Sequence, residues 1–188
     1  GKLFIIGGGS RPSAMIDRII LESGIDKEGY GVILPMSSSE PDTAAYYAKK
    51  QFLVKGITNV HALQFVKEEK LSSDKIDSLK NARMIYISGG DQNRFMEVVA
   101  NTDIEKAIHE AYKDGSLIAG TSAGAAVMST MMITGNELKN AEYSSTFRNL
   151  QSENIEIKTG LGMIDNVIID QHFVKRSRYN RLLSAVIE

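Results

Sequence analysis

The chain has 188 residues, of which 43% are hydrophobic and 24% charged, so it is long enough for one domain with a sizeable core. Its formal net charge of −1 gives it no electrostatic reason to bind nucleic acid or anionic lipid. It contains no cysteine, which excludes disulfides, thiolate-bound zinc and a thiol nucleophile.

Short apolar runs alternate with longer helical segments in the first half of the chain. Residues 3–6 are a predicted buried strand that ends in Gly7-Gly8-Gly9, and residues 12–23 form the next helix, with Ser10 as candidate cap and Gly24 as stop. The alternation then continues through strands at 31–35, 60–65 and 84–87 and helices at 41–55, ended by Gly56, and 72–80, capped by Ser72 or Ser73.

The second half repeats this pattern and then becomes irregular. Helices are predicted at 93–100 and 103–113, a strand at 117–119, a buried helix at 123–131 and a late strand at 167–169. The polar stretch 134–160 is typical of a long active-site loop or a hairpin pair. Residues 178–188 look helical but have no C-cap, so we expect the natural protein to continue.

The predicted strands are continuously apolar, which indicates a parallel sheet covered on both faces. Together with the β-α alternation, this predicts a doubly wound α/β fold in a single domain over residues 1–188. The carboxyl ends of parallel strands meet at one edge of the sheet, where ligands bind. The motifs that follow these strands are therefore expected to lie close together.

Gly120-Thr121-Ser122-Ala123-Gly124 fits G-x-S-x-G, the nucleophile elbow. A serine on a tight strand-to-helix turn needs small neighbours, and the helix end that follows offers free N–H groups, beginning with Ala123, to an oxyanion. The motif lies directly after an apolar strand, as an elbow requires. A glycine-rich turn that binds a phosphate, or that only packs tightly, is the alternative.

Further motifs are predicted at the same edge. Gly89-Gly90 can present an N–H group to an oxyanion, although a plain turn is equally compatible with it. Of the three histidines, only His172 follows a predicted strand, which makes it the candidate general base. Gly7-Gly8-Gly9 does not fit G-x-G-x-x-G, so nucleotide binding is only weakly indicated.

Three arginines, Arg176, Arg178 and Arg181, follow the candidate base closely. Guanidinium groups bind carboxylates through two parallel hydrogen bonds, so this cluster favours a carboxylate-bearing substrate. A solvated helix face and a phosphate-binding patch are the alternatives.

Taken together, these segments resemble the cyanophycinase branch of the S51 serine peptidases, which are relatives of dipeptidase E. The matching motifs are Gly-Gly-Asp-Gln at 89–92, Gly-Thr-Ser-Ala-Gly-Ala at 120–125 and Asp-Gln-His-Phe-x-x-Arg-x-Arg-x-x-Arg at 170–181. The resemblance implies a fold similar to the class I glutamine amidotransferase domain, with Ser122 as nucleophile and His172 as base. It also implies a substrate pocket formed by Gln92, Asp170, Gln171, Arg176, Arg178 and Arg181.

The implied activity is hydrolysis of cyanophycin, a polyaspartate that carries one arginine on each side-chain carboxyl group, to β-aspartyl-arginine dipeptides. The third member of the triad is a Glu beyond residue 188 in the cyanophycinase branch, whereas spacing as in the dipeptidase branch selects Glu137. A broader acidic-dipeptide or isoaspartyl peptidase, and a non-catalytic binding domain of the same fold, are the competing functions.

The histidines show no zinc-type spacing, no apolar run reaches transmembrane length, and no signal peptide opens the chain. We therefore expect no metal, no cofactor, no membrane partner and no nucleic-acid partner. The cytoplasm is the default location, although the chain starts at Gly1 without Met and a leader could have been removed. The family resemblance implies a homodimer.

Overall fold

The computed structural model describes residues 1–140, 142 and 144–187. A five-stranded sheet in the order β1-β5-β4-β2-β3 lies at its centre, and all of its strand pairs are parallel. Its strands are β1 (Lys2–Ile6), β2 (Gly31–Leu34), β3 (Val60–Ala62), β4 (Met84–Ile87) and β5 (Leu117–Thr121). The parallel sheet between helices confirms the predicted doubly wound α/β fold.

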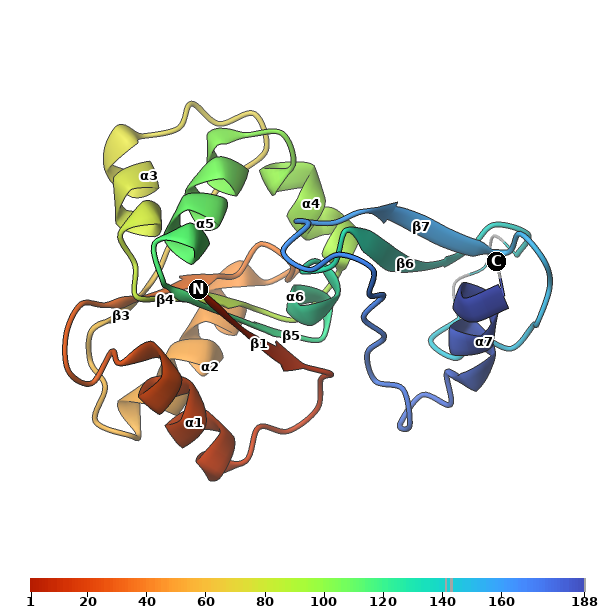
Figure 1. The fold of residues 1–188 in the computed structure, drawn as a ribbon, viewed down its shortest axis with the longest axis horizontal. Coiled ribbons are helices and arrows are strands. Elements are labelled where there is room, and N and C mark those ends of the chain that lie inside the picture. The colour runs from red at the N-terminus through yellow and green to blue at the C-terminus, as the bar shows by residue number, and fades with distance from the viewer. Residues whose placement is uncertain (141, 143, 188) are drawn as a thin grey trace.

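Helices cover both faces of the sheet (Figure 1). One face is covered by α1 (Ser13–Ser23) and α2 (Pro41–Leu53), and the other by α3 (Ser73–Lys80), α4 (Gln92–Val99) and α5 (Asp103–Lys113). Strand β4 shows why its sequence is continuously apolar, because Ile85 packs into the core on one face and Tyr86 into the core on the other. In the part of the chain that the structure describes, no helix is both long and apolar enough to span a membrane.

The predicted ends of α1 are partly right. Gly24 is in the left-handed conformation with φ of 70°, and its N–H donates to the Ile20 carbonyl, which confirms it as the stop. The predicted cap at Ser10 is wrong, because Pro12 occupies the cap position and no side chain caps the helix. Pro12 already has extended backbone, so the helix begins after it without a side-chain cap.

The helix predicted over 123–131 is much shorter in the structure. Helix α6 spans Ala123–Ala126, and strand β6 (Met131–Glu137) already begins where the predicted helix should end. The carbonyls of Val127 and Met128 accept hydrogen bonds from the N–H groups of Leu161 and Met163, at 2.6 and 2.8 Å. A neighbouring segment therefore takes the acceptors that a longer helix would use.

The polar stretch at 134–160 forms a hairpin rather than one long loop. Strand β6 pairs antiparallel with β7 (Ile155–Thr159), and the connection between them includes Ala141 and Tyr143, which lie outside the described residues. Ile133, Phe147 and Ile155 form a small core of their own, against which Ala185 of the last helix packs. The hairpin and this helix lie together at one end of the molecule (Figure 1).

The strand predicted at 167–169 is wrong. These residues form no ladder, and Val167 is 43% exposed, so the segment is not an internal strand of the sheet. A backbone bond joins the following stretch to Gly7, the residue after β1, from the His172 N–H to the Gly7 carbonyl at 2.7 Å. The final helix, α7 (Tyr179–Ile187), starts one residue after its predicted start, and Glu188 lies outside the described residues.

Candidate active site

Ser122 lies at a sharp turn between β5 and α6, at the carboxyl edge of the sheet. Its φ and ψ angles are 55° and −112°, in a region that is costly for a residue with a side chain. Backbone bonds hold this conformation, because the Ser122 N–H donates to the Ile6 carbonyl at 2.9 Å and its carbonyl accepts from Ala125 and Ala126. The surrounding fold therefore maintains the strained geometry of a nucleophile elbow.

The two glycines of the elbow are required by close backbone contacts. A Cβ atom at Gly120 would lie 2.1 Å from the Gly124 carbonyl oxygen, and one at Gly124 would lie 2.3 Å from the Ile87 carbonyl oxygen. Backbone atoms at such distances cannot move away cheaply, so only glycine fits at both positions. The small residues in G-x-S-x-G thus meet the steric demand that the sequence motif indicated.

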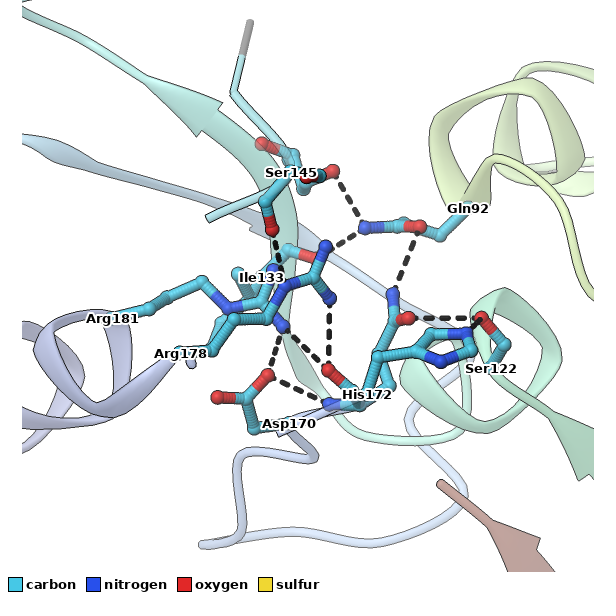
Figure 2. A network of polar contacts seen from close by, with 10 residues as sticks. Gln92, Ser122, Ile133, Ser145, Asp170, His172, Arg178 and Arg181 are labelled. Carbon is cyan, nitrogen blue, oxygen red and sulfur yellow. Dashed lines mark hydrogen bonds and ion pairs between the residues drawn. The ribbon is translucent and has the colours of Figure 1, made fainter. Parts of the chain in front are cut away.

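The hydroxyl of Ser122 faces the ring of His172 (Figure 2). The distance from Ser122 Oγ to His172 Nε2 is 2.8 Å, a hydrogen-bond distance within the range that proton transfer between a serine and a histidine requires. His172 also has a positive φ of 51°, and its backbone is held by Gly7 on one side and by the Arg176 N–H on the other. Two segments that are distant in sequence therefore meet at this contact.

A chain of two amide side chains ends on the same hydroxyl (Figure 2). Gln92 Nε2 donates to the carbonyls of Ile133 and Thr134 at 2.9 and 2.6 Å, which fixes its oxygen toward Gln171. Gln171 Nε2 donates to that oxygen at 3.4 Å, and Gln171 Oε1 lies 2.9 Å from Ser122 Oγ. The Ser122 hydroxyl has one proton and two acceptors within reach, Gln171 Oε1 and His172 Nε2. It can donate to only one of them at a time.

The environment of His172 favours its neutral form. Partial burial lowers the pKa of His172 below its ordinary value, and the positive charges of Arg176, Arg178, Lys175 and Arg181 lower it further. A neutral imidazole at neutral pH can accept a proton from a serine hydroxyl.

We expect Arg176→Gln to raise the pKa of His172, because removing a nearby positive charge favours the protonated imidazolium. The acid limb of kcat/KM should move to higher pH, and NMR titration of the His172 ring should show the same direction. Arg148→Gln removes an equal charge from an exposed position and serves as the control. An unchanged titration in Arg176→Gln would show that the guanidinium does not influence the ring.

The arginines that follow His172 are not a solvated helix face. Arg178 and Arg181 are only 3% and 2% exposed, and Arg181 forms a buried ion pair with Asp170. Arg178 donates to the Gln171 carbonyl at 2.8 Å and Arg181 donates to the same oxygen at 3.1 Å. These two guanidinium groups thus hold the main chain next to His172, while Arg176 is half-buried.

A pocket of about 310 Å³ brings together most of the residues expected to bind substrate. Its walls include Gly90, Gln92, Gln171, Arg176, Arg178 and Arg181. The carboxylate of Asp170 does not line this pocket, because it is turned toward Arg181 and the Gln171 N–H. Three arginines and one acidic residue, Asp91, line the pocket, so its net charge is positive, and it adjoins Ser122 through Gln171.

Gly90 and Ala123 are the two oxyanion donors that the sequence predicts. Ala123 follows Ser122 directly, and Gly90 follows Gly89, whose Cβ position lies 3.4 Å from Ser122 Cβ. Gly90 has a φ of 145°, and a Cβ atom there would lie 2.1 Å from the Ser37 carbonyl oxygen, so the position requires glycine. Among the described residues, neither the Gly90 N–H nor the Ala123 N–H has a hydrogen-bond acceptor. Both donors remain available to a ligand.

The acid of a triad is not formed by Glu137. Its carboxylate accepts hydrogen bonds from Asn140 and Asn154 at 2.6 and 2.9 Å, at the far end of β6. No hydrogen bond or ion pair joins an Asp or Glu side chain to His172 within residues 1–140, 142 and 144–187. In the same residues, no group of three or more potential ligands is placed to hold a metal ion.

Gly8 makes room for the His172 ring, and it is not among the site residues predicted from the sequence. A Cβ atom on Gly8 would lie 2.5 Å from Cε1 and 2.6 Å from Nε2 of His172, so the ring occupies the space that a side chain would need. As a sequence motif, the glycine run after β1 indicates only weak nucleotide binding. Its predicted position at the same edge of the sheet as Ser122 is the sequence feature that could identify Gly8 as a site residue.

The whole chain matches one protein family. The model of peptidase family S51 matches residues 3–188. Cyanophycinase from Nostoc sp. strain PCC 7120 is 34% identical over 190 residues, which cover 98% of this chain and 60% of that protein. Cyanophycinase from Geminocystis herdmanii is 34% identical over 157 residues, which cover 82% of this chain and 54% of that protein. This chain thus spans little more than half the length of these relatives.

Solved structures support the fold. A peptidase from an acI-B1 Actinobacterium superposes with a TM-score of 0.70 at 23% identity, covering 95% of this chain and 71% of that one. A putative peptidase E from Listeria monocytogenes superposes with a TM-score of 0.58 at 18% identity, covering 96% of this chain and 86% of that one. At these identities the likeness is evidence for the fold alone.

Proposed function

The chain belongs to peptidase family S51, and on this premise we propose that it is a serine exopeptidase that cleaves the aspartate backbone of cyanophycin to β-aspartyl-arginine dipeptides. One observation carries the proposal. Ser122 Oγ lies 2.8 Å from His172 Nε2, on a strained elbow beside a pocket that contains arginine side chains. The relatives named cyanophycinase support the choice of substrate.

The proposed reaction begins with proton transfer from Ser122 Oγ to His172 Nε2 as the oxygen attacks the scissile carbonyl carbon. The N–H groups of Gly90 and Ala123 donate to the oxyanion that develops. His172 then protonates the leaving amine, and an acyl-enzyme remains on Ser122. A water molecule, deprotonated by His172, hydrolyses that ester and restores the serine hydroxyl.

The charge of the pocket supports an acidic substrate. Each arginine of cyanophycin is attached through its amino group, so its own carboxylate is free. Arg176 is the half-buried member of the cluster, and it lines the pocket without a hydrogen bond or ion pair to another side chain among the described residues. We assign it the direct contact with a substrate carboxylate, whereas Arg178 and Arg181 position Gln171.

The test is to incubate the purified protein with insoluble cyanophycin and to identify the soluble products by mass spectrometry. Release of β-aspartyl-arginine is the expected result. If the protein cleaves simple Asp-X dipeptides but leaves cyanophycin uncleaved, its function is that of a broader acidic-dipeptide peptidase. Binding of cyanophycin without any product would favour a non-catalytic domain. Sedimentation of the same sample tests the homodimer that the family resemblance implies.

A further inference from the structure

A second cavity adjoins the nucleophile on the face of the sheet that α1 and α2 cover. Its volume is about 140 Å³, and its walls include Arg11, Tyr47, Tyr86, Ser88, Gly89 and Thr121. None of its lining residues also lines the arginine-containing pocket. It reaches the reaction centre through Thr121, which precedes Ser122, and through Gly89, whose Cβ position lies 3.4 Å from Ser122 Cβ.

The guanidinium of Arg11 is held in place by its neighbours. Arg11 Nε donates to Gln51 Oε1 at 2.5 Å, and Gln51 Nε2 donates to the Tyr47 carbonyl at 3.1 Å. The two terminal nitrogens of Arg11 have no acceptor among the described residues. The side chain is therefore oriented through one nitrogen and keeps its remaining donors for a ligand.

Tyr86 supplies a second unsatisfied group at this cavity. The residue is 1% exposed, and within the part of the chain that is described its hydroxyl makes no hydrogen bond of good geometry, although the Gln51 side chain lies close to it. Burial raises the pKa of Tyr86 by more than the neighbouring Arg11 charge and the Gln51 side chain lower it, so the hydroxyl stays protonated and can donate. A buried hydroxyl without a partner is costly, which points to a ligand oxygen that completes it.

We propose that this cavity is a carboxylate subsite that binds a cyanophycin unit on the other side of the scissile bond from the unit in the arginine-containing pocket. Arg11 and Tyr86 would donate to the two oxygens of that carboxylate. The volume holds a carboxylate and the carbons next to it but not a whole arginine, which therefore extends toward solvent. This assignment rests on the proposed function.

A consequence follows for specificity. Two carboxylate subsites that flank Ser122 require a substrate with carboxylates on both sides of the cleaved bond. Cyanophycin meets this requirement at every internal bond, because each aspartate carries an arginine with a free carboxylate. A peptide with one such unit occupies only one subsite and should be a poorer substrate.

The experiment compares Arg11→Gln with Arg18→Gln, which removes an equal charge from an exposed position on α1. On cyanophycin, Arg11→Gln should lower kcat/KM roughly tenfold, the loss expected for one charged hydrogen bond, and Arg18→Gln should match the wild type. On polymer whose arginine carboxylates are converted to amides, the wild type should lose activity and Arg11→Gln should cause no further loss. Tyr86→Phe keeps the ring and should reproduce part of the effect.

A binding measurement separates this proposal from the proposed function. Calorimetry of a short β-aspartyl-arginine oligomer with Ser122→Ala, alone and combined with Arg11→Gln, reports the subsite without turnover. Unchanged affinity in the combined variant overturns the subsite, while the peptidase assignment stands. Weaker binding in the combined variant supports the subsite even where cyanophycin is not cleaved. If Ser122→Ala does not bind the oligomer at all, both proposals fail.

Discussion

Replacing Ser122 by Ala is expected to lower kcat/KM on cyanophycin by about 10,000-fold or more. The hydroxyl oxygen is the atom proposed to form the acyl-enzyme, and no other side chain lies at its position on the elbow. In the Ser122→Ala variant, water would have to attack the scissile carbonyl directly. Only substrate binding and the N–H groups of Gly90 and Ala123 would still assist the reaction.

The fold should tolerate this change. Alanine adds no atoms at the elbow, and the hydrogen bonds that hold the turn come from the backbone of Ser122. We expect the free energy of unfolding to change by less than about 1 kcal/mol, as measured in urea. Turnover by Ser122→Ala at the rate of the wild type would rule out this residue as the nucleophile.

Ser116→Ala is the matched control, because Ser116 precedes the opposite end of the same strand. Its hydroxyl donates to the Ala82 carbonyl at 2.5 Å, so this variant should lose about 1 kcal/mol of stability. Its kcat/KM should remain that of the wild type. The two variants thus separate a hydroxyl that stabilises the fold from one that is needed for the reaction.

The elbow could be predicted from the sequence because its requirements are local. A tight strand-to-helix turn needs glycine within two residues on each side of Ser122, and the atoms that exclude a Cβ belong to the turn itself or to the adjacent strand. His172 lies at the predicted edge of the sheet, beside Ser122, although residues 167–169 form no strand. An apolar run in the sequence indicates a buried segment. Whether that segment joins a sheet depends on a neighbouring strand, which the run itself does not identify.

The roles of the arginines could not be predicted from spacing. A separation of three residues predicts that Arg178 and Arg181 share one helix face, but it does not say whether that face meets solvent or substrate. The structure buries both, because the Gln171 carbonyl and the Asp170 carboxylate accept from them. The amide chain through Gln92 depends on carbonyls of β6, a strand that the sequence indicates only as part of one of two alternatives, a hairpin or a long loop. Both cases depend on contacts between distant segments.

Gly8→Ala should reduce kcat/KM by about 100-fold, because the new methyl group would occupy the position of the His172 ring. The His172 backbone is tied to the Gly7 carbonyl, so the ring must rotate away and Nε2 must leave its 2.8 Å contact with Ser122. A side chain that rotates costs little stability. Beyond the cost of backbone strain at this positive φ, the effect of the methyl group should therefore appear in activity and not in the free energy of unfolding.

Gly9→Ala provides the control for backbone strain in this prediction. Gly8 and Gly9 have φ angles of 104° and 87°, so alanine is strained at both positions, but a Cβ atom at Gly9 would meet nothing within 4 Å. The two variants should lose similar amounts of stability in urea, on the order of 1–2 kcal/mol. Only Gly8→Ala should lose most of its activity, and its His172 resonances should shift. Equal activity in the two variants would mean that the observed position of the His172 ring is not required for the reaction.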